Sequence, residues 1–308
     1  MHNLKYTPLC SLDDYMLFLS KGLHADNRTF VDTHDAEYRT AYSAYLSNIN
    51  PCNLENVSPL WAESATDPQK VKSEKRSVRG LSSSLYESKS AFKEPYWKEL
   101  KKLNGGKELI CPLCGLDACE HLDHYIPREI MPEFSVFKPN LIPLCHDCNE
   151  DKRALWLNDQ GERLFFNAFF DKLEDKPICV CNISIRGGSP YAEIRANPNL
   201  NTTDTEDKLV LNTIEKLKLI KKWQHHCNQI MNKEVVRLQQ DCKTTKSVDG
   251  LSYWNEKCAN YTSYLRNPNI WDFVELALFQ SIIVSIELRD WCIHQYNEIK
   301  QMTNEANT

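Results

Sequence analysis

Two Cys-x-x-Cys pairs constrain the fold of this chain more strongly than any other feature of its sequence. Thirty residues separate the pairs, whose members are Cys111, Cys114, Cys145 and Cys148. Each pair lets two thiolates from one tight turn reach a single ion, and four thiolates form a closed tetrahedral zinc site. Because the intervening segment is too short for a large hydrophobic core, zinc is expected to stabilise the local fold. An alternative ligand set replaces one of the thiolates with Cys119 or His121.

The segment between and after the pairs has the pattern of two strands followed by a helix. Residues 120–126 are strand-like and end at a proline, residues 140–144 form a short returning strand, and residues 146–157 favour a helix. These elements together make a ββα unit. The N-terminus of such a helix carries free N–H groups and a positive dipole, and both favour phosphate binding.

Polar residues with potential chemistry occur in each part of this unit. Asp123 and His124 are adjacent on the first strand, Asn140 opens the second strand, and Asn149 lies in the first turn of the helix. An imidazole suits a general base because its reference pKa is about 6.5. Asp123 and Asn149 offer oxygen ligands to Mg²⁺ or Mn²⁺ and leave positions open for water and phosphate. Asn140 can fix the hairpin or the imidazole. This set favours metal-dependent phosphodiester hydrolysis.

Two structural consequences follow from these positions. Neighbours on a regular strand point to opposite faces, so Asp123 and His124 can share one site only if the strand is twisted or bulged there. Basic side chains are expected to contact the phosphate, and Lys152 is the best placed because it follows Asn149 at i+3 on one helix face. The full set of candidate phosphate contacts is Arg128, Lys138, Lys152 and Arg153.

The motifs CPLCG, LDHYIP, PEFSVFKPNLIPLC and CHDCNEDK resemble the HNH endonuclease family of ββα-metal nucleases, over about residues 108–153. A weaker likeness to a subgroup of bacterial HNH proteins continues in YW before the zinc segment, in NAFFD and in NPNIWDFVELAL. The resemblance implies that His124 is the general base, that Asp123 binds the catalytic metal and that Asn140 orients the base. Asn149 stands at the last position of the motif, so the triad is His-Asn-Asn, as in some family members with a four-cysteine zinc site.

The same resemblance implies an activity and a setting. The expected reaction is cleavage of DNA to 3′-hydroxyl and 5′-phosphate ends, with a structural Zn²⁺ and a catalytic Mg²⁺ or Mn²⁺. By analogy with HNH proteins that serve as effectors, the chain is expected to act in a bacterial antiphage system, with a partner such as an ATPase subunit. The alternative is a zinc-stabilised module that binds nucleic acid or protein without catalysis. A protein that only binds does not require the complete set of Asp-His pair and two asparagines. The presence of this set therefore favours an enzyme over a binding module.

Composition limits where the protein acts and how it meets DNA. The formal net charge is −5, whereas sequence-specific DNA readers are more often basic, so contact with DNA is expected to be local. The 13 cysteines are an odd number, and we find neither a secretory signal nor an apolar run long enough to span a membrane. These features favour a cytoplasmic protein with reduced thiols.

The N-terminal region, residues 1–105, is expected to be helical. Residues 12–23 and 35–46 have helical spacing, with aromatic faces that favour a core role. Residues 1–69 carry nine acidic and four basic residues, whereas residues 70–107 carry eleven basic residues and four Glu. This basic arm is either a phosphate-tracking element or a solvated linker, and the sequence does not favour one over the other.

The C-terminal region, residues 161–308, begins with aromatic residues and a hairpin turning at Gly187 and Gly188. Residues 206–240, 252–265 and 271–301 follow as helices, with Thr205 and Asn269 as N-caps of the first and last. Residues 273–288 are apolar on nearly all sides, which favours the centre of a bundle, and a partner-docking or oligomer surface is the alternative.

The expected fold class is therefore α+β and predominantly helical. A zinc-stapled ββα-metal core at residues 106–160 is flanked by the helical N-terminal region and by a C-terminal region that contains one β-hairpin.

Overall fold

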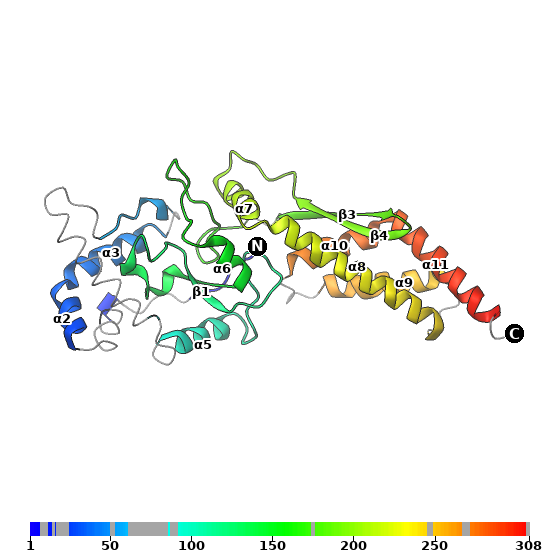
Figure 1. Ribbon diagram of the computed structural model, residues 1–308, viewed down its shortest axis with the longest axis horizontal. Coiled ribbons are helices and arrows are strands. Elements are labelled where there is room, and N and C mark those ends of the chain that lie inside the picture. The colour runs from blue at the N-terminus through cyan, green and yellow to red at the C-terminus, as the bar shows by residue number, and fades with distance from the viewer. Residues whose placement is uncertain are drawn as a thin grey trace. The chain divides into compact units, whose positions relative to one another are not determined.

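The structure is a computed structural model that describes residues 1–6, 12–13, 16, 25–49, 53–60, 86, 92–173, 176–244, 249–266 and 272–305. The expected helix at 12–23 falls largely outside these residues, as do the N-terminal part of the basic arm at 70–79 and the Asn269 cap. The described chain is mostly helical and contains two small antiparallel sheets (Figure 1). The expected α+β class is confirmed.

Contacts divide the chain into two units. The first comprises Met1–Leu113 and Asp117–Glu174, and the second comprises Cys114–Leu116 and Asp175–Thr308. The expected N-terminal region and ββα core thus fall within one unit rather than two. The reason is aromatic packing. Tyr42 stacks on Phe137 with ring centroids 4.4 Å apart, and Tyr45 meets Phe134 edge-on at 5.0 Å.

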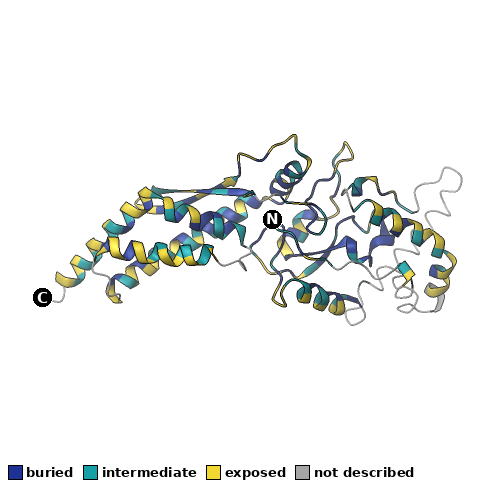
Figure 2. Cartoon of the chain, turned by 180° about the vertical axis from the view of Figure 1, so that it is seen from behind, coloured by how far each residue is buried: buried dark blue, intermediate teal, exposed yellow. Residues whose placement is uncertain are grey.

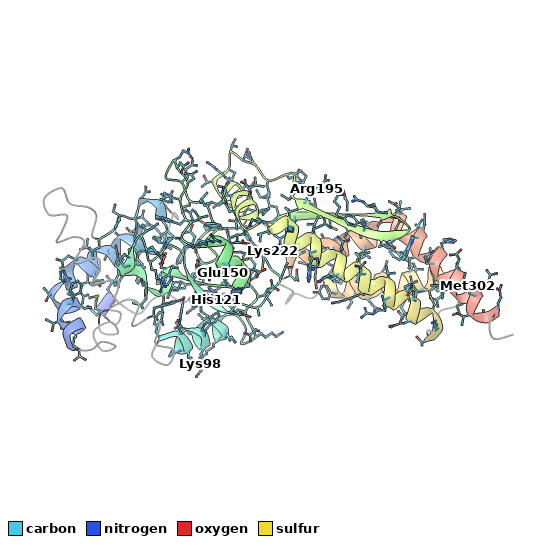
Figure 3. All side chains as sticks on the ribbon, viewed as in Figure 1. Lys98, His121, Glu150, Arg195, Lys222 and Met302 are labelled. Atoms are coloured by element: carbon cyan, nitrogen blue, oxygen red, sulfur yellow. The ribbon has the colours of Figure 1, made fainter. Side chains whose placement is uncertain are left out.

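Besides the ββα core, the described part of the first unit contains further helical elements. They are α2 (Ala25–Thr33), α3 (Asp35–Ser47), the 3-10 turn η1 (Leu54–Asn56) and α5 (Glu94–Leu103). The three tyrosines of α3 at positions 38, 42 and 45 are fully buried, as their helical spacing predicts. Figure 2 colours the described chain by burial. On α5, Tyr96 and Leu100 are buried, while Lys98 points outward (Figure 3).

The ββα core consists of β1 (His121–His124), β2 (Leu141–Leu144) and α6 (His146–Lys152). Two 3-10 turns, η3 (Pro132–Phe134) and η4 (Lys138–Asn140), lie in the loop between the strands. A twist or a bulge was expected at Asp123 and His124. The register pairs His121 with Leu144 and His124 with Leu141 without interruption, so β1 has no bulge there. Instead the strand itself ends at His124, and the chain bends at Tyr125.

Helix α6 is shorter than the expected 146–157 because the chain leaves the helical conformation at Arg153. That residue has φ 49° and ψ −134°, a backbone conformation that residues other than glycine rarely adopt. The helix therefore ends at Lys152, and Arg153 begins the loop that follows.

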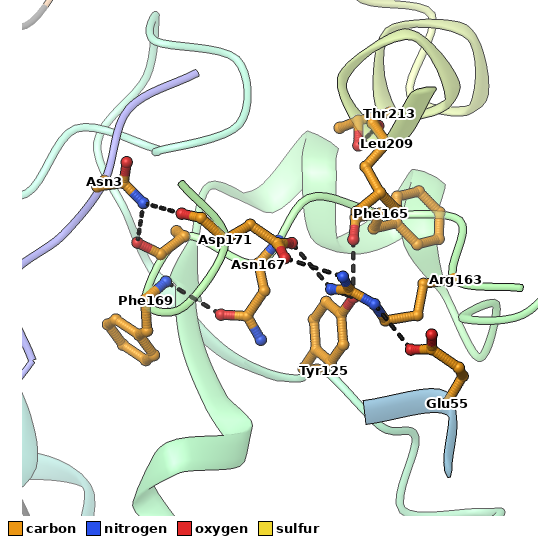
Figure 4. Close-up of polar contacts among 11 residues, drawn as sticks. Asn3, Glu55, Tyr125, Arg163, Phe165, Asn167, Phe169, Asp171, Leu209 and Thr213 are labelled. Atoms are coloured by element: carbon orange, nitrogen blue, oxygen red, sulfur yellow. Dashed lines mark hydrogen bonds and ion pairs between the residues drawn. The ribbon is translucent and has the colours of Figure 1, made fainter. Parts of the chain in front are cut away.

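A buried charged cluster holds the segment after α6 against the core (Figure 4). The Arg163 guanidinium makes two bonds of 2.9 Å to the Asp171 carboxylate, and its Nε lies 3.1 Å from Glu55. Arg163 also donates to the Tyr125 hydroxyl at 3.1 Å, and that hydroxyl donates to the Phe165 carbonyl. The NAFFD segment thus ends in a structural carboxylate. The cluster ties it to the residue that follows His124.

The second unit combines a hairpin with helices. Strands β3 (Cys179–Arg186) and β4 (Ser189–Ala196) pair in register about the expected Gly187-Gly188 turn, and Cys179 and Cys181 are both buried. The helices are α7 (Thr205–Lys216), α8 (Leu219–Thr244), α9 (Gly250–Leu265), α10 (Phe273–Val284) and α11 (Ile286–Glu305). Helix α8 packs on β4, and α10 packs on β3.

Two helices that were expected to be continuous are broken. The one expected at 206–240 divides at Lys218, which adopts φ 53°, and the one expected at 271–301 divides at Ser285. The expected caps also shift. The Asp204 side chain, rather than that of Thr205, accepts an N–H at the start of α7, and Asp272 caps α10. Val284 and Ile286 flank the second break and are 76% and 66% exposed, so the expected burial of residues 273–288 is incomplete.

No helix in the described part of the chain is both long enough and apolar enough to cross a membrane.

Candidate functional site

The four expected zinc ligands form one buried cluster. Their sulfurs lie within 4.8 Å of one another, and the cysteines are Cys111, Cys114, Cys145 and Cys148. At a Zn–S distance of about 2.3 Å, tetrahedral geometry places sulfurs roughly 3.8 Å apart, so the cluster fits zinc or a similar thiophilic ion. Gly115 adopts φ 74°, a conformation that glycine permits, and Leu116 N–H lies 3.5 Å from the Cys114 sulfur. Among the described residues, neither Cys119 nor His121 belongs to this group.

The helix that carries the candidate catalytic asparagine begins at the second cysteine pair. Cys145 is the N-cap residue of α6 and Cys148 lies in its first turn, directly before Asn149. A metal held by these thiolates would therefore fix the start of α6 and the direction in which Asn149 leaves the helix.

A pocket of about 360 Å³ lies where β1, the loop after it and α6 meet. Its lining contains Asp123, His124 and Asn149, three of the four residues expected to act together, and it also contains Arg128 and Arg153. The full lining is Tyr86, His121, Leu122, Asp123, His124, Pro127, Arg128, Glu129, Asn149, Glu150, Arg153 and Ala154. The lining residues therefore include three with carboxylates, one with an amide, two with imidazoles and two with guanidinium groups. These are the donor types suited to a divalent ion and a phosphate.

The His124 ring is held by a backbone carbonyl. Its Nε2 lies 2.8 Å from the Ser135 carbonyl oxygen, which can only accept a hydrogen bond. Nε2 of the neutral ring therefore carries the proton, and Nδ1 is the basic atom. Burial lowers the pKa of His124 to about 3, and nearby cations, Arg128 first, act in the same direction. The imidazole is thus neutral near pH 7.

Asp123 is buried and paired with a lysine. The residue is 7% exposed, and its Oδ2 lies 2.8 Å from Lys152 Nζ. Burial raises the pKa of the Asp123 carboxyl, and the Lys152 ammonium opposes this shift. Oδ2 is thus buried beside the ammonium, and Asp123 is among the residues that line the pocket.

Asn140 lies beneath the pocket rather than in its lining. The side chain is fully buried. Its Oδ1 accepts from Ile126 N–H at 2.8 Å, and its Nδ2 donates to the Ile126 and Phe134 carbonyls at 3.0 and 3.4 Å. These bonds fix both ends of the loop that carries Ser135, the hydrogen-bond partner of His124. Asn140 is therefore connected to the His124 ring through this loop, by way of Ser135.

The four candidate phosphate contacts divide into two pairs. Arg128 and Arg153 line the pocket. Lys138 does not, and its Nζ lies 2.6 Å from Glu99. Lys152 is only 1% exposed, so the expectation that it is the best placed phosphate contact is corrected. A helical wheel places it on the Asn149 side of α6, but its side chain turns inward to Asp123.

The sequence interpretation missed several residues around His124. The Tyr86 ring lies 4.6 Å from the His124 ring, and Lys93 Nζ lies 4.2 Å above the Tyr86 ring. Both residues belong to the basic arm, and Tyr86 lines the pocket. His121 and Glu150 also line the pocket from β1 and α6 (Figure 3). His121 could have been identified because it precedes Asp123 by two residues and so shares its strand face.

A second group of possible ligands lies in the other unit. Ligand atoms of His226, Asp272 and Glu275 lie within 4.8 Å of one another. Each has a structural role already, however. Asp272 caps α10, and Glu275 pairs with His226 at 3.6 Å and accepts from the Tyr264 hydroxyl. The group therefore consists of the N-cap of α10 and an ion pair that joins α10 to His226 on α8.

Comparison with known proteins gives one partial similarity. Over 60 residues the chain is 37% identical to protein ea31 of Escherichia phage lambda, and the match covers 19% of this chain and 19% of that protein. No protein-family model matches the chain, and no solved structure matches it. The similarity assigns no activity, so the chemistry of the pocket carries the functional argument.

Proposed function

We propose that this protein is a metal-dependent endonuclease of the HNH type that hydrolyses phosphodiester bonds in DNA. The observation that supports this most is a single pocket lined by Asp123, His124 and Asn149. A neutral imidazole, a carboxylate and an amide of this kind are what water activation and metal-assisted hydrolysis require. The sequence resemblance to HNH nucleases assigns the same three residues.

In the proposed mechanism His124 removes a proton from the attacking water. Its Nε2–H stays bonded to the Ser135 carbonyl, so Nδ1 is the atom that receives the proton. A pKa of about 3 leaves the imidazole neutral and able to accept a proton, and the negative charge of a bound phosphodiester would raise that pKa. The hydrogen bond to Ser135 also fixes the plane in which the Nδ1 lone pair lies.

The other pocket residues hold the substrate and the ion. Asp123 and Asn149 would bind Mg²⁺ or Mn²⁺, which polarises the phosphate and lowers the pKa of bound water. Arg128 and Arg153 are the phosphate contacts that the pocket offers, and guanidinium groups suit phosphate oxygens because they donate in pairs. The separate four-cysteine cluster would hold the structural Zn²⁺.

The test is nicking of supercoiled plasmid DNA by the zinc-loaded protein with Mg²⁺ or Mn²⁺. We expect His124→Ala and Asp123→Asn to lower the rate at least 100-fold, the lower end of typical general acid–base contributions. His294→Ala is the matched control because that residue is exposed in the other unit. Equal nicking by wild type and His124→Ala would remove His124 from the mechanism. RNA and single-stranded DNA run in parallel define the substrate.

A second candidate function is a zinc-stabilised binding module without catalysis. The ion pair between Asp123 and Lys152 favours it, because that carboxylate already has a cationic partner. This candidate predicts DNA or protein binding that survives His124→Ala and no cleavage with any metal. Filter binding and nicking, measured on the same preparations, separate the two functions.

We further propose that the nuclease works in the cytoplasm as the effector of a bacterial antiphage system, together with a partner such as an ATPase subunit. The support is the analogy with HNH effectors and the local rather than overall basic charge. Expression of the gene with its neighbours should lower phage plating, and His124→Ala should abolish that protection. Protection that persists in the variant would argue against a nuclease effector.

A further inference from the structure

Lys152 is a buried lysine whose side chain joins α6 to β1. Its ammonium lies 2.8 Å from Asp123 Oδ2 and donates to the His124 carbonyl at 2.9 Å. The Phe165 ring centroid lies 5.8 Å from the same nitrogen. Ordering and burying a lysine side chain is unfavourable unless its charge is paired. Here the Asp123 carboxylate supplies the opposite charge.

The two contacts of Lys152 reach the two residues of the Asp-His pair. One contact holds the carboxylate of Asp123, and the other holds the backbone of His124, at the point where β1 ends. Asn149 lies three residues before Lys152 on the same short helix. The lysine therefore sets the distance between the strand that carries Asp123 and the helix that carries Asn149.

The ion pair also holds one oxygen of the Asp123 carboxylate. Oδ2 is enclosed beside the ammonium, and Asp123 also lines the pocket. Carboxylate ligands of metal ions are commonly held by a second group in this manner, and loss of that group typically weakens metal binding about 10–100-fold. Lys152 has the position of such a group.

We propose that Lys152 is a positioning residue that orients the Asp123 carboxylate and anchors β1 to α6, so that Asp123 and Asn149 together serve the ion site. This inference rests on the proposed function, in which those two residues hold the divalent ion. It gives Lys152 a role different from phosphate contact, and that role belongs to the protein before any substrate binds.

The experiment measures Mn²⁺ binding to the zinc-loaded full-length protein by titration calorimetry and by the loss of the free-ion electron paramagnetic resonance signal. Lys152→Met removes the charge and keeps the length of the side chain. We expect it to raise the Mn²⁺ dissociation constant about 10–100-fold. Lys138→Met is the matched control, because Lys138 pairs with Glu99 and does not line the pocket, and its dissociation constant should stay within about twofold of wild type.

Zinc stoichiometry and a cooperative melting curve show whether each variant is folded. If Lys152→Met does not fold, Lys152→Gln takes its place. The glutamine amide can still donate to Asp123 Oδ2 or to the His124 carbonyl oxygen. We therefore expect a smaller rise in the Mn²⁺ dissociation constant, of at least about threefold. Asp123→Asn provides the reference in which a proposed metal ligand itself is changed.

Three results are decisive. Weaker Mn²⁺ binding in the folded Lys152 variant, but not in Lys138→Met, supports the inference. Binding that depends on Asp123 but is unchanged or tighter in the Lys152 variant overturns the positioning role and leaves the proposed nuclease intact. Binding that is insensitive to Asp123→Asn overturns the metal assignment, and the role of Lys152 falls with it.

Discussion

Replacement of Arg163 by methionine should destabilise the first unit by several kcal/mol. The Asp171 carboxylate is 3% exposed and would keep only the Asn167 N–H, at 2.7 Å, as a hydrogen-bond partner in this cluster. The substitution also removes the cationic partner of Glu55 and a donor to the Tyr125 hydroxyl. Breaking a buried ion pair by removing one partner costs about 3–5 kcal/mol, a large share of the roughly 5–15 kcal/mol that stabilises a typical domain.

The assay is urea denaturation followed by circular dichroism, with zinc present throughout. For a denaturant dependence of about 2 kcal/mol per molar urea, a loss of about 4 kcal/mol lowers the midpoint by roughly 2 M. Arg39→Met is the control, because Arg39 makes an exposed pair with Asp35 at 2.6 Å, and exposed pairs contribute about 0–1 kcal/mol.

The double variant Arg163→Met, Asp171→Leu tests the cause. It removes both charges together, so it should be more stable than Arg163→Met alone. A loss below about 1 kcal/mol in the single variant, or a double variant no more stable than it, would refute the reasoning that a stranded carboxylate is what destabilises the protein.

Three further predictions concern zinc, strain and pH. Cys148→Ser should lower the bound zinc measured by mass spectrometry and increase amide hydrogen exchange in α6; full zinc occupancy would contradict the four-thiolate site. Arg153→Gly should raise the melting temperature, because glycine relieves about 1 kcal/mol of strain at φ 49°, while DNA binding weakens through loss of a guanidinium; a lower melting temperature would contradict the strain. Burial raises the pKa of Asp272 to about 6, above its unfolded value, so its contribution to stability is complete below about pH 4 and is lost as pH rises through 6. Asp272→Asn should therefore stabilise the protein at pH 8 by about 1–2 kcal/mol and flatten the dependence of stability on pH between 4 and 7, and an unchanged slope in denaturation experiments would count against this explanation.

The four-cysteine cluster and the core strands could be predicted from sequence because their causes are local. Cys-x-x-Cys spacing fixes which thiolates can share an ion, and the proline after Ile126 and the Gly187-Gly188 turn mark where strands end. The four-cysteine cluster, the two hairpins and the burial of the α3 tyrosines all follow from such signals.

The helix breaks could not be predicted, because neither contains a glycine or a proline. Lys218 adopts a positive φ that its own chemistry disfavours, and Ser285 interrupts an apolar run without any residue that ends a helix by itself. Packing of α8 on β4 and of α10 on β3 constrains these segments, and that information is not local.

The direction of the Lys152 side chain could not be predicted from the sequence either. Helical spacing correctly places Lys152 beside Asn149, but the same spacing is compatible with a lysine in solvent and with one turned toward β1. The buried Asp123 decides between them, and its burial depends on how the hairpin meets the helix.

Side chains from α8, α10 and α11 form hydrogen bonds with backbone groups of both strands of the second unit's hairpin. On β4, the Ala192 and Ile194 N–H groups donate to the side chains of Asn228 and Gln224, one turn apart on α8. On β3, the Ser281 hydroxyl donates to the Cys181 carbonyl, and Ile185 N–H donates to Glu287. A two-stranded sheet with exposed edges can recruit strands from other molecules and aggregate. At these four positions the helices supply the missing partners, which disfavours strand addition there.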